Sequence, residues 1–325
     1  MFDGDRQLPG SVPELRLLSA LHHLVLSGHA PQLADHYPSV GGTAPPAGAW
    51  AAAEHALADD ADLVAARLDR TVQTNEPGRC VSLFGGLLWL AERHRMPIRL
   101  LEIGASAGLN LNADRYRYVV GGAALGDPAC ELAFVEPWIG APVGDLAGAA
   151  SLDVCERAGC DPAPIDPTTD DGLRSLMCYV WPDELDRLAR LRLAAQIAAK
   201  HPVQIDRSDA ADWLARRLTA APDGVLTVVW QSVVRQYLEA AEWDAIKARI
   251  RCGAATIPLA WLVLEPGADG FELRCLGGTA RRPATAGDRR VPRAAGALER
   301  RAGVGGPPPR ARRRARDAPS TSPPC

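Results

Sequence analysis

A glycine turn follows a short apolar run near residue 100, and its residue types suit the binding of a small charged molecule. The run ends in Glu102, and Gly104-Ala105-Ser106-Ala107-Gly108 comes next. Glycines let the backbone turn tightly and approach a ligand, and the N-terminus of a following helix offers free amide donors. The pattern predicts a strand, a turn and a helix that together bind a nucleotide-type ligand.

The same residues fit a methyl-donor site. In proteins similar to class I methyltransferases, an acidic strand end and a Gly-rich turn hold the amino-acid part of S-adenosylmethionine, and the corresponding residues here are Glu102, Gly104, Ala105, Ser106 and Gly108. Asp161 would take the ribose hydroxyls, and the pair Asp209 and Ala210 would meet the adenine amino group. The gap from the turn to Asp161 exceeds the roughly 20 residues of a dinucleotide site, so residues 115–150 would be an insertion.

Two other enzyme classes use related patterns. The turn also fits the G-x-S-x-G nucleophile elbow of a serine hydrolase, with Ser106 as the nucleophile. The only histidine after it is His201, which precedes the clearest strands, and no His-Gly-Gly segment comes before the elbow. A nicotinamide dehydrogenase would need glycine where Ser106 stands and an acid roughly 20 residues later. Both classes fit less well than the methyl-donor site.

A polar segment between two apolar helices supplies further candidates. Arg79 could bind a carboxylate of the ligand or substrate, and Asn75 lies four residues before it. A helix-capping turn at Asn75 is the alternative. Asn110 follows the glycine turn and is a third substrate-binding candidate. No catalytic base stands out, and the candidates by position are Asp114, Gln231 and Tyr237.

Composition excludes several classes of protein. The chain has 325 residues, 47% of them hydrophobic, and no run of about 18 apolar residues that would predict a membrane span. Its eight cysteines form no C-x-x-C pair and its histidines form no H-E-x-x-H pattern, so we expect neither a disulfide framework nor a metal site. The N-terminus lacks an apolar signal segment, which predicts a cytoplasmic location.

The charges are unevenly distributed along the chain. Residues 281–325 contain 12 arginines, no lysine and three acids, whereas the rest of the chain is acidic. An acidic body argues against nucleic-acid binding by the folded part. The tail lacks aromatic residues and periodicity, which predicts disorder. A basic binding arm is another interpretation of the tail, and its Arg-, Pro-, Ala- and Gly-rich composition favours a third, out-of-frame translation of GC-rich DNA.

Hydrophobic spacing predicts the elements that would position these residues. Residues 1–95 form a predicted helical N-terminal cap, because helical periodicity extends over 12–95. Residues 96–280 alternate strands with helices, which predicts an α/β fold with a mostly parallel sheet and helices on both faces. Strands are expected at 203–205, 224–230, 257–264 and 271–276, helices at 183–200, 209–219 and 233–250, and an irregular stretch at 115–150.

Four segments are specific enough to suggest a family. They are Ala20-Leu21-His22-His23-Leu24 with Tyr37-Pro38-Ser39; Gln73-Thr74-Asn75-Glu76-x-Gly78-Arg79-Cys80; Leu101 to Tyr116; and Val180-Trp181-Pro182 with Leu188 and Leu191. Together they resemble a bacterial family, the domain of unknown function 2332 family. The resemblance implies a class I methyltransferase-like Rossmann fold with a helical N-terminal part, and no established activity. It also implies a shortened N-terminus, because the family usually has more helical sequence before the first segment.

These observations favour a cytoplasmic bacterial protein that binds S-adenosylmethionine and transfers its methyl group to a small molecule. The alternative is a non-catalytic nucleotide-binding or regulatory protein with the same fold. The absence of an obvious catalytic side chain after the strand at 224–230 favours this alternative.

Overall fold

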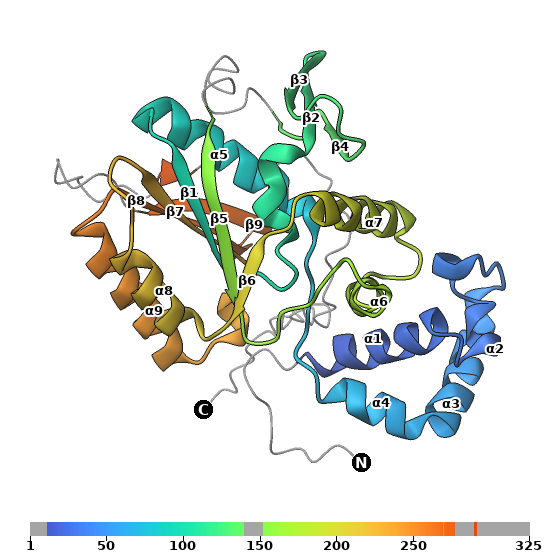
Figure 1. The fold of residues 1–325 in the computed structure, drawn as a ribbon. Helices are drawn as coiled ribbons and strands as arrows, with labels where there is room; N and C mark the ends of the chain where they lie inside the picture. The colour runs from blue at the N-terminus through green and yellow to red at the C-terminus, as the bar shows by residue number, and fades with distance from the viewer. Residues whose placement is uncertain (1–11, 140–151, 269, 277–288, 291–325) are drawn as a thin grey trace, which may run out of the picture.

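The chain folds around a mixed seven-stranded sheet with helices on both faces (Figure 1). The computed structural model describes residues 12–139, 152–268, 270–276 and 289–290. The strand order is β10-β9-β8-β7-β1-β5-β6. The strands are β1 (Ile98–Ile103), β5 (Val154–Asp161), β6 (Gln204–Arg207), β7 (Leu226–Ser232), β8 (Leu259–Gly267), β9 (Gly270–Leu276) and β10 (Arg289–Arg290).

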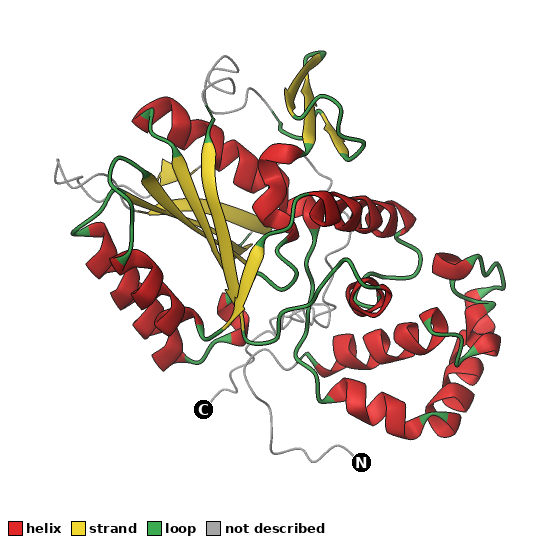
Figure 2. Cartoon of the chain, viewed as in Figure 1, coloured by secondary structure: helices red, strands yellow, loops and turns green. Residues whose placement is uncertain are grey.

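Most of this sheet is parallel. β1 lies between β5 and β7, and β6 and β8 extend the sheet on either side, all in parallel. β9 returns antiparallel to β8, and β10 is antiparallel to β9. Parallel neighbours need crossover connections, and from β5 to β8 the helices between the strands supply them. Figure 2 shows these helices on either side of the strands. The predicted α/β fold with a mostly parallel, two-sided sheet is confirmed.

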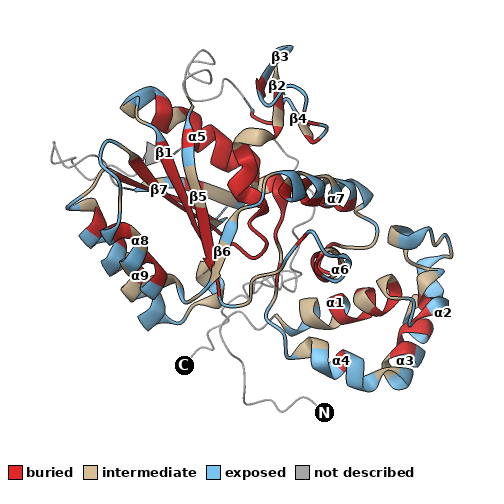
Figure 3. Cartoon of the chain, in the orientation of Figure 1, coloured by how far each residue is buried: buried red, intermediate tan, exposed pale blue. Residues whose placement is uncertain are grey.

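Successive side chains of the central strands pack against different helices. Leu100 of β1 and Val228 of β7 share a hydrophobic cluster with α5 (Cys80–His94) and α7 (Leu185–Lys200). Leu101 and Val229 share another with α8 (Ala210–Thr219) and α9 (Ala240–Ala254). Because both faces are covered, β1 and β7 are buried along their whole length, as Figure 3 shows. Strands buried on both faces are near-continuous apolar runs in sequence.

The first helices of the chain form a layer of their own. They are α1 (Pro13–Leu26), α2 (Pro31–Ala34), α3 (Ala49–Asp59) and α4 (Ala61–Leu68). They pack around a separate cluster that includes Leu21, Leu24 and Val64, and Figure 1 shows them beside α6 (Asp170–Met177), away from the sheet. In contrast, α5 packs on the sheet. The domain boundary at residue 95 stays a prediction. The helix α5 precedes this boundary, although its apolar side chains belong to the same hydrophobic cluster as those of the sheet.

Residues 115–150 are not irregular throughout, contrary to expectation. A small sheet of order β3-β2-β4 forms from β2 (Arg117–Val120), β3 (Ala123–Gly126) and β4 (Ala133–Val135). Gly121 and Gly122 have positive φ, which suits the two central positions of a tight hairpin turn. Tyr118 stacks on Phe84 of α5 with ring centroids 4.0 Å apart, so the small sheet packs on the main core. Each of these strands has only three or four residues, which is too short to show a period-2 pattern in the sequence. The rest of the expected irregular stretch, residues 140–150, lies outside the described residues.

Two helices differ from expectation near the carboxyl ends of strands. The segment after the glycine turn is a 3-10 helix, η4 (Leu109–Arg115). The helix expected at 233–250 begins only at Ala240, because Val233 has a φ of 56° and a capping box of Glu239 and Glu242 starts the helix. The other 3-10 turns are η1 (Pro38–Val40), η2 (Pro46–Gly48), η3 (Pro77–Arg79) and η6 (Arg235–Tyr237).

Two predictions from composition concern the membrane and the tail. Among the described helices, none has both the length and the apolar character to cross a bilayer. The tail predicted at 281–325 lies outside the described residues, apart from the two residues of β10. The interpretations of the tail therefore stay predictions.

Gly108→Ala should destabilise the fold more than Gly224→Ala. Both glycines have positive φ, +70° and +74°, which costs an L-residue roughly 1–2 kcal/mol. A Cβ on Gly108 would lie 2.7 Å from Ile205 Cδ1, whereas nothing lies within 4 Å of one on Gly224. We expect an extra loss of roughly 1–3 kcal/mol in the unfolding free energy at Gly108, measured by urea denaturation. Equal losses would show that the neighbours of Gly108 move aside without cost.

Candidate functional site

The carboxyl ends of the parallel strands bring the predicted binding residues to one edge of the sheet. From β1 the chain proceeds to β5 and β6 on one side and then to β7 and β8 on the other. Ligands of open α/β sheets bind outside the carboxyl ends of the strands where the order reverses in this way. β1 and β7 are those strands, and Glu102 is the register partner of Trp230 at this edge.

A tight turn follows β1 at this edge. Gly104, Ser106 and Gly108 have φ values of 66°, 54° and 70°, a region that glycine adopts freely and serine rarely. The Ala105 amide donates to the Cys160 carbonyl at 3.0 Å, and the Gly108 amide donates to the Ala105 carbonyl at 2.7 Å. The predicted glycine turn is thus fixed against the end of β5.

Gly104 lies against protein as well as against the site. A Cβ there would lie 2.6 Å from Val234 Cγ2, just after β7. Close packing with Val234, together with the positive φ, therefore requires glycine at this position.

Asp161 joins the glycine turn to the N-terminal part of the chain. Its Oδ2 accepts from the Ser106 amide at 2.9 Å, and its Oδ1 accepts from Gln73 Nε2 at 3.1 Å and from the Ala163 amide at 2.8 Å. Asp161 is 5% exposed, and hydrogen bonds to a charged acceptor are stronger than neutral ones. The expected role of Asp161 at ribose hydroxyls stays a prediction, and three protein donors already surround the carboxylate.

Asn75 holds the other end of the turn. Its Oδ1 accepts from the Leu109 amide at 2.9 Å, at the start of η4. One amide that we expected to be free for a ligand is therefore satisfied by the protein itself. The Asn75 side chain is buried, and within the described part of the chain its Nδ2 forms no hydrogen bond. Asn75 thus acts as a helix cap from a distant segment and keeps a donor for a ligand.

Glu102 is a buried carboxyl group with few partners. Asn110 Nδ2 donates to its Oε1 at 3.4 Å, and its Oε2 has no hydrogen-bond partner. Burial raises the pKa of Glu102 to about 8, and the negative charge of Asp161 adds to the rise. Asn110, Arg79 and Trp230 act to lower the pKa. At neutral pH the carboxyl group is therefore mostly protonated in the free protein.

Arg79 lies near Glu102 and has no carboxylate partner. Its Nη1 donates to the Ser232 carbonyl and to Ser232 Oγ, both at 3.3 Å. Among the described residues it forms no ion pair. Burial lowers the pKa of Arg79, whereas the charges of Glu76 and Glu102 raise it. A half-buried guanidinium in this state suits a carboxylate or phosphate of a ligand.

An ion-pair network that no sequence pattern predicted holds the polar segment in place. Glu76 accepts from Arg187 Nε at 2.6 Å, from Arg190 Nη1 at 2.9 Å and from the Gly78 amide at 2.8 Å. Burial acts to raise the pKa of Glu76, but the two arginines and the amide bring it below its ordinary value. The three-residue spacing of the arginines on α7 was the signal that could have indicated a shared face.

Two of the three candidate bases are engaged elsewhere. Asp114 forms an ion pair with Arg157 of β5. Gln231 Nε2 donates to Glu265 Oε1 at 2.8 Å, and its Oε1 accepts from Trp261 Nε1 at 3.2 Å. Both ends of the Gln231 amide are therefore occupied, on the face of β7 away from Trp230. Among the described residues, no hydrogen bond joins Asp114 or Gln231 to Glu102, and their catalytic roles stay predictions.

The remaining candidates lie at the same edge of the sheet. Tyr237 is in η6, where burial raises its pKa and the positive charge of Arg79 opposes the rise. Asp209 and Ala210 begin α8 after β6, and Asp209 is exposed and forms no side-chain capping bond. The Ser208 amide donates to the Asp161 carbonyl at 3.2 Å, which places this loop beside β5. The adenine-binding role of Asp209 and Ala210 stays a prediction.

Neither a serine nucleophile with its base nor a metal centre is assembled in the described ranges. Ser106 Oγ is buried without a hydrogen-bond partner, although all seven histidines lie among the described residues. His201 lies at the end of α7, where its carbonyl accepts from Asn112 at 3.2 Å. In the same ranges no group of three or more His, Cys, Asp or Glu residues is arranged to hold a metal ion.

The family of the chain follows from a comparison of sequences. A family model described as "Uncharacterized protein conserved in bacteria (DUF2332)" matches residues 5–303. The chain therefore belongs to this bacterial family, and the resemblance seen in its four segments is confirmed. The match extends beyond residue 280, where we placed the end of the sheet domain. No curated protein and no solved structure matches the chain.

Glu102→Gln should remove a pH dependence of stability. The pKa of Glu102 is about 8 in the folded chain against 4.5 for an ordinary glutamate. The folded state holds this proton more tightly, so its stabilisation is complete below the unfolded pKa and is lost as pH rises through the folded pKa. Between about pH 5 and about pH 9, the unfolding free energy of the wild type should fall relative to Glu102→Gln by roughly 4 kcal/mol.

Denaturant unfolding across this pH range measures the effect. Glu131→Gln removes an exposed carboxylate instead and is the matched control. Parallel pH profiles for the wild type and Glu102→Gln would contradict the buried, protonated state of Glu102.

Glu76→Gln should destabilise the chain by about 3 kcal/mol, because it leaves two arginines beside a buried neutral group. Glu184→Gln is the control, since Glu184 also pairs with Arg187 but does so as a more exposed residue just before the start of α7. We expect a loss of less than about 1 kcal/mol for Glu184→Gln in chemical denaturation. Similar losses in the two variants would show that the Glu76 network is no stronger than a surface pair.

Proposed function

We propose that this chain binds S-adenosylmethionine at the carboxyl edge of its sheet and transfers the methyl group to a small molecule. The pair of Glu102 and Arg79 beside the glycine turn supports this best. Glu102 has one oxygen without a partner, and Arg79 has no carboxylate partner among the described residues. A zwitterionic amino-acid group would satisfy both, with its ammonium on Glu102 and its carboxylate on Arg79.

The strand order also supports this proposal. Numbered along the chain, the parallel strands β6-β5-β1-β7-β8 have the order 3-2-1-4-5 of doubly wound, dinucleotide-binding sheets. In such sheets the ligand meets the turn after the first strand, which is the position of the turn from Gly104 to Gly108. We therefore infer a Rossmann-like sheet of the class I methyltransferase-like type.

The adenosine part would lie along β5 and β6. Asp161 accepts three hydrogen bonds from the protein, and a carboxylate offers roughly four acceptor sites, so one is left for a ribose hydroxyl. Asp209 and Ala210, at the start of α8, would meet the adenine. With these contacts, the amino-acid group of the ligand would lie over the glycine turn.

The residues of this chain would bind and orient the reactants. When bound, the donor supplies an electrophilic methyl group for in-line displacement. Glu102 would release its proton to hold the ammonium group, and Arg79 would fix the carboxylate. Orientation of this kind removes a large part of a reaction barrier. Tyr237, whose pKa burial raises, would act at neutral pH as a hydrogen-bond donor to the methyl acceptor.

A second function is favoured by the state of the candidate bases. Asp114 is paired with Arg157, and the Gln231 amide is occupied at both ends. A protein that binds a nucleotide without catalysis needs no base. A non-catalytic nucleotide-binding or regulatory protein is therefore the alternative to methyl transfer.

Arg79→Met should weaken binding of S-adenosylhomocysteine, which keeps the amino-acid group. The wild-type chain should bind this ligand in isothermal titration calorimetry, and loss of a charge-assisted contact should raise the dissociation constant at least roughly tenfold. Arg192→Met removes an exposed arginine of α7 and should bind as the wild type does. A folded wild-type chain that binds neither S-adenosylmethionine nor S-adenosylhomocysteine would contradict the proposal.

Formation of a reaction product distinguishes the two proposed functions. The chain would be incubated with S-adenosylmethionine and a mixture of small bacterial metabolites. Formation of S-adenosylhomocysteine supports methyl transfer. Binding without product formation supports the non-catalytic alternative.

A further inference from the structure

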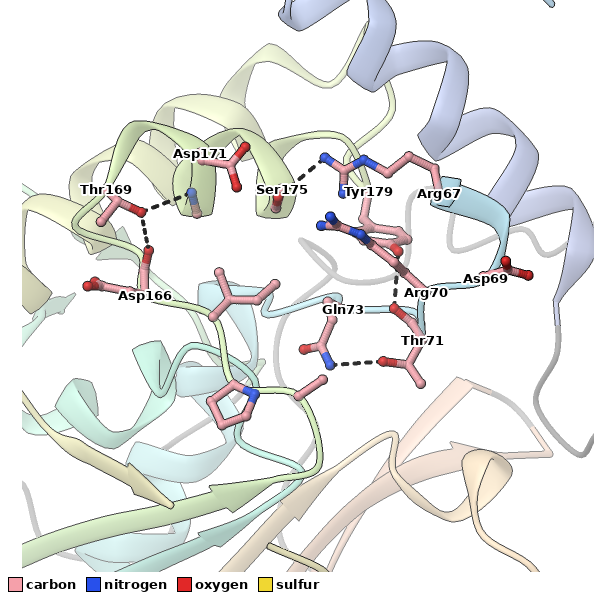
Figure 4. A pocket seen from close by; sticks show the side chains of 14 residues that line it. Arg67, Asp69, Arg70, Thr71, Gln73, Asp166, Thr169, Asp171, Ser175 and Tyr179 are labelled. Atoms are coloured by element: carbon pink, nitrogen blue, oxygen red, sulfur yellow. Dashed lines mark hydrogen bonds between the residues drawn. The ribbon is translucent and has the colours of Figure 1, made fainter. Parts of the chain in front are cut away.

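A cavity of about 530 Å³ lies between the N-terminal helices and the loop after β5 (Figure 4). It is lined by residues from three segments, 67–73, 163–166 and 169–179. Its volume falls within the range of small-molecule sites, about 300–1,000 Å³. None of the residues assigned to the proposed methyl-donor site lines it. The cavity is therefore a separate feature with its own chemistry.

Two arginines supply positive charge to one wall. Arg67 Nη2 donates to Ser175 Oγ at 3.3 Å, and Figure 4 shows the guanidinium of Arg70 directed into the cavity. Burial lowers the pKa of Arg67, and the neighbouring charge of Arg70 lowers it further. Among the described residues neither arginine forms an ion pair. Two like charges without a carboxylate partner favour an anionic ligand.

The described carboxylates around the cavity form no ion pair with these arginines. Asp166 accepts from the Thr168 amide at 2.9 Å and from Thr168 Oγ1 at 2.6 Å. Asp171 pairs with Arg174 at 3.5 Å, and its negative charge also acts to raise the pKa of Arg67. Figure 4 shows the Asp69 side chain directed away from the cavity. Arg67 and Arg70 are therefore left without an ion-pair partner among the described residues, so their positive charge can act on an anionic ligand.

Gln73 lines the cavity, and its buried side-chain carbonyl has no hydrogen-bond partner. It is 8% exposed, and its Nε2 donates to Asp161 Oδ1 at 3.1 Å and to Thr71 Oγ1 at 3.4 Å. A carboxylate only accepts, so this contact fixes which end of the amide faces Asp161. The Oε1 atom is buried and has no partner. An unsatisfied buried acceptor costs about 1–3 kcal/mol, and a hydroxyl or N–H of a ligand would remove this cost.

We propose that this cavity binds a small phosphorylated polyhydroxy compound, either a sugar phosphate or a nucleoside monophosphate. The phosphate would lie against Arg67 and Arg70, because the planar fork of arginine matches phosphate oxygens. A hydroxyl of the same ligand would donate to Gln73 Oε1. Gln73 and the glycine turn share Asp161, so the cavity adjoins the proposed methyl-donor site but does not depend on that function.

Calorimetric titration of the full chain tests this proposal with four probes: ribose 5-phosphate, adenosine monophosphate, inorganic phosphate and ribose. At least one of the first two should bind roughly tenfold or more tightly than phosphate or ribose alone, since only these carry both recognised groups. Arg70→Met should weaken that binding roughly tenfold. Arg70 is exposed, so this variant should fold. Arg249→Met, which removes an exposed arginine of α9, is the matched control.

Each outcome decides the proposal. Tighter binding of the sugar phosphate or of the nucleotide supports it and identifies the source of the phosphate. If inorganic phosphate bound as tightly as ribose 5-phosphate and adenosine monophosphate, the proposal that the ligand is a polyhydroxy compound would be overturned. Failure of all four probes to bind, or equal binding by the wild type and Arg70→Met, would overturn the site.

Discussion

The buried carboxylate of Asp161 is the interaction on which the rest of the structure depends. It binds the amide of Ser106 in the glycine turn, the side chain of Gln73 in the N-terminal segment and the amide of Ala163 in its own loop. These three segments are far apart in sequence and meet at this carboxylate. Asn75 repeats the connection at the other end of the turn. The proposed methyl-donor site and the arginine-lined cavity lie on either side of this junction.

Two buried acids at this edge of the sheet differ in how they are satisfied. Asp161 has three donors and is used to hold the fold together. Glu102 has one long hydrogen bond and an oxygen without a partner, so burial raises its pKa to about 8. An acid that the protein leaves unsatisfied is costly for stability and is a mark of a binding site. The cost is offset when a cationic group of a ligand converts Glu102 to its charged form.

The sequence predicted the parallel sheet, the glycine turn and most helices, because each has a strong local pattern. It did not predict the orientation of side chains that depends on distant partners. Gln231 looked like a site residue because it ends a buried strand, but it faces Trp261. Glu76 and Arg187 are 111 residues apart, and only folding brings them together. The strands between 117 and 135 were missed because each has three or four residues.

The most direct measurement is the number of protons released when S-adenosylhomocysteine binds. Calorimetry at about pH 7 in buffers of different ionisation enthalpy gives this number. If the ligand ammonium binds ionised Glu102, whose pKa is about 8 in the free chain, binding should release close to one proton. The Glu102→Gln variant should release none. Binding to the wild type without proton release would contradict the account, because Glu102 would then not be the group that holds the ligand.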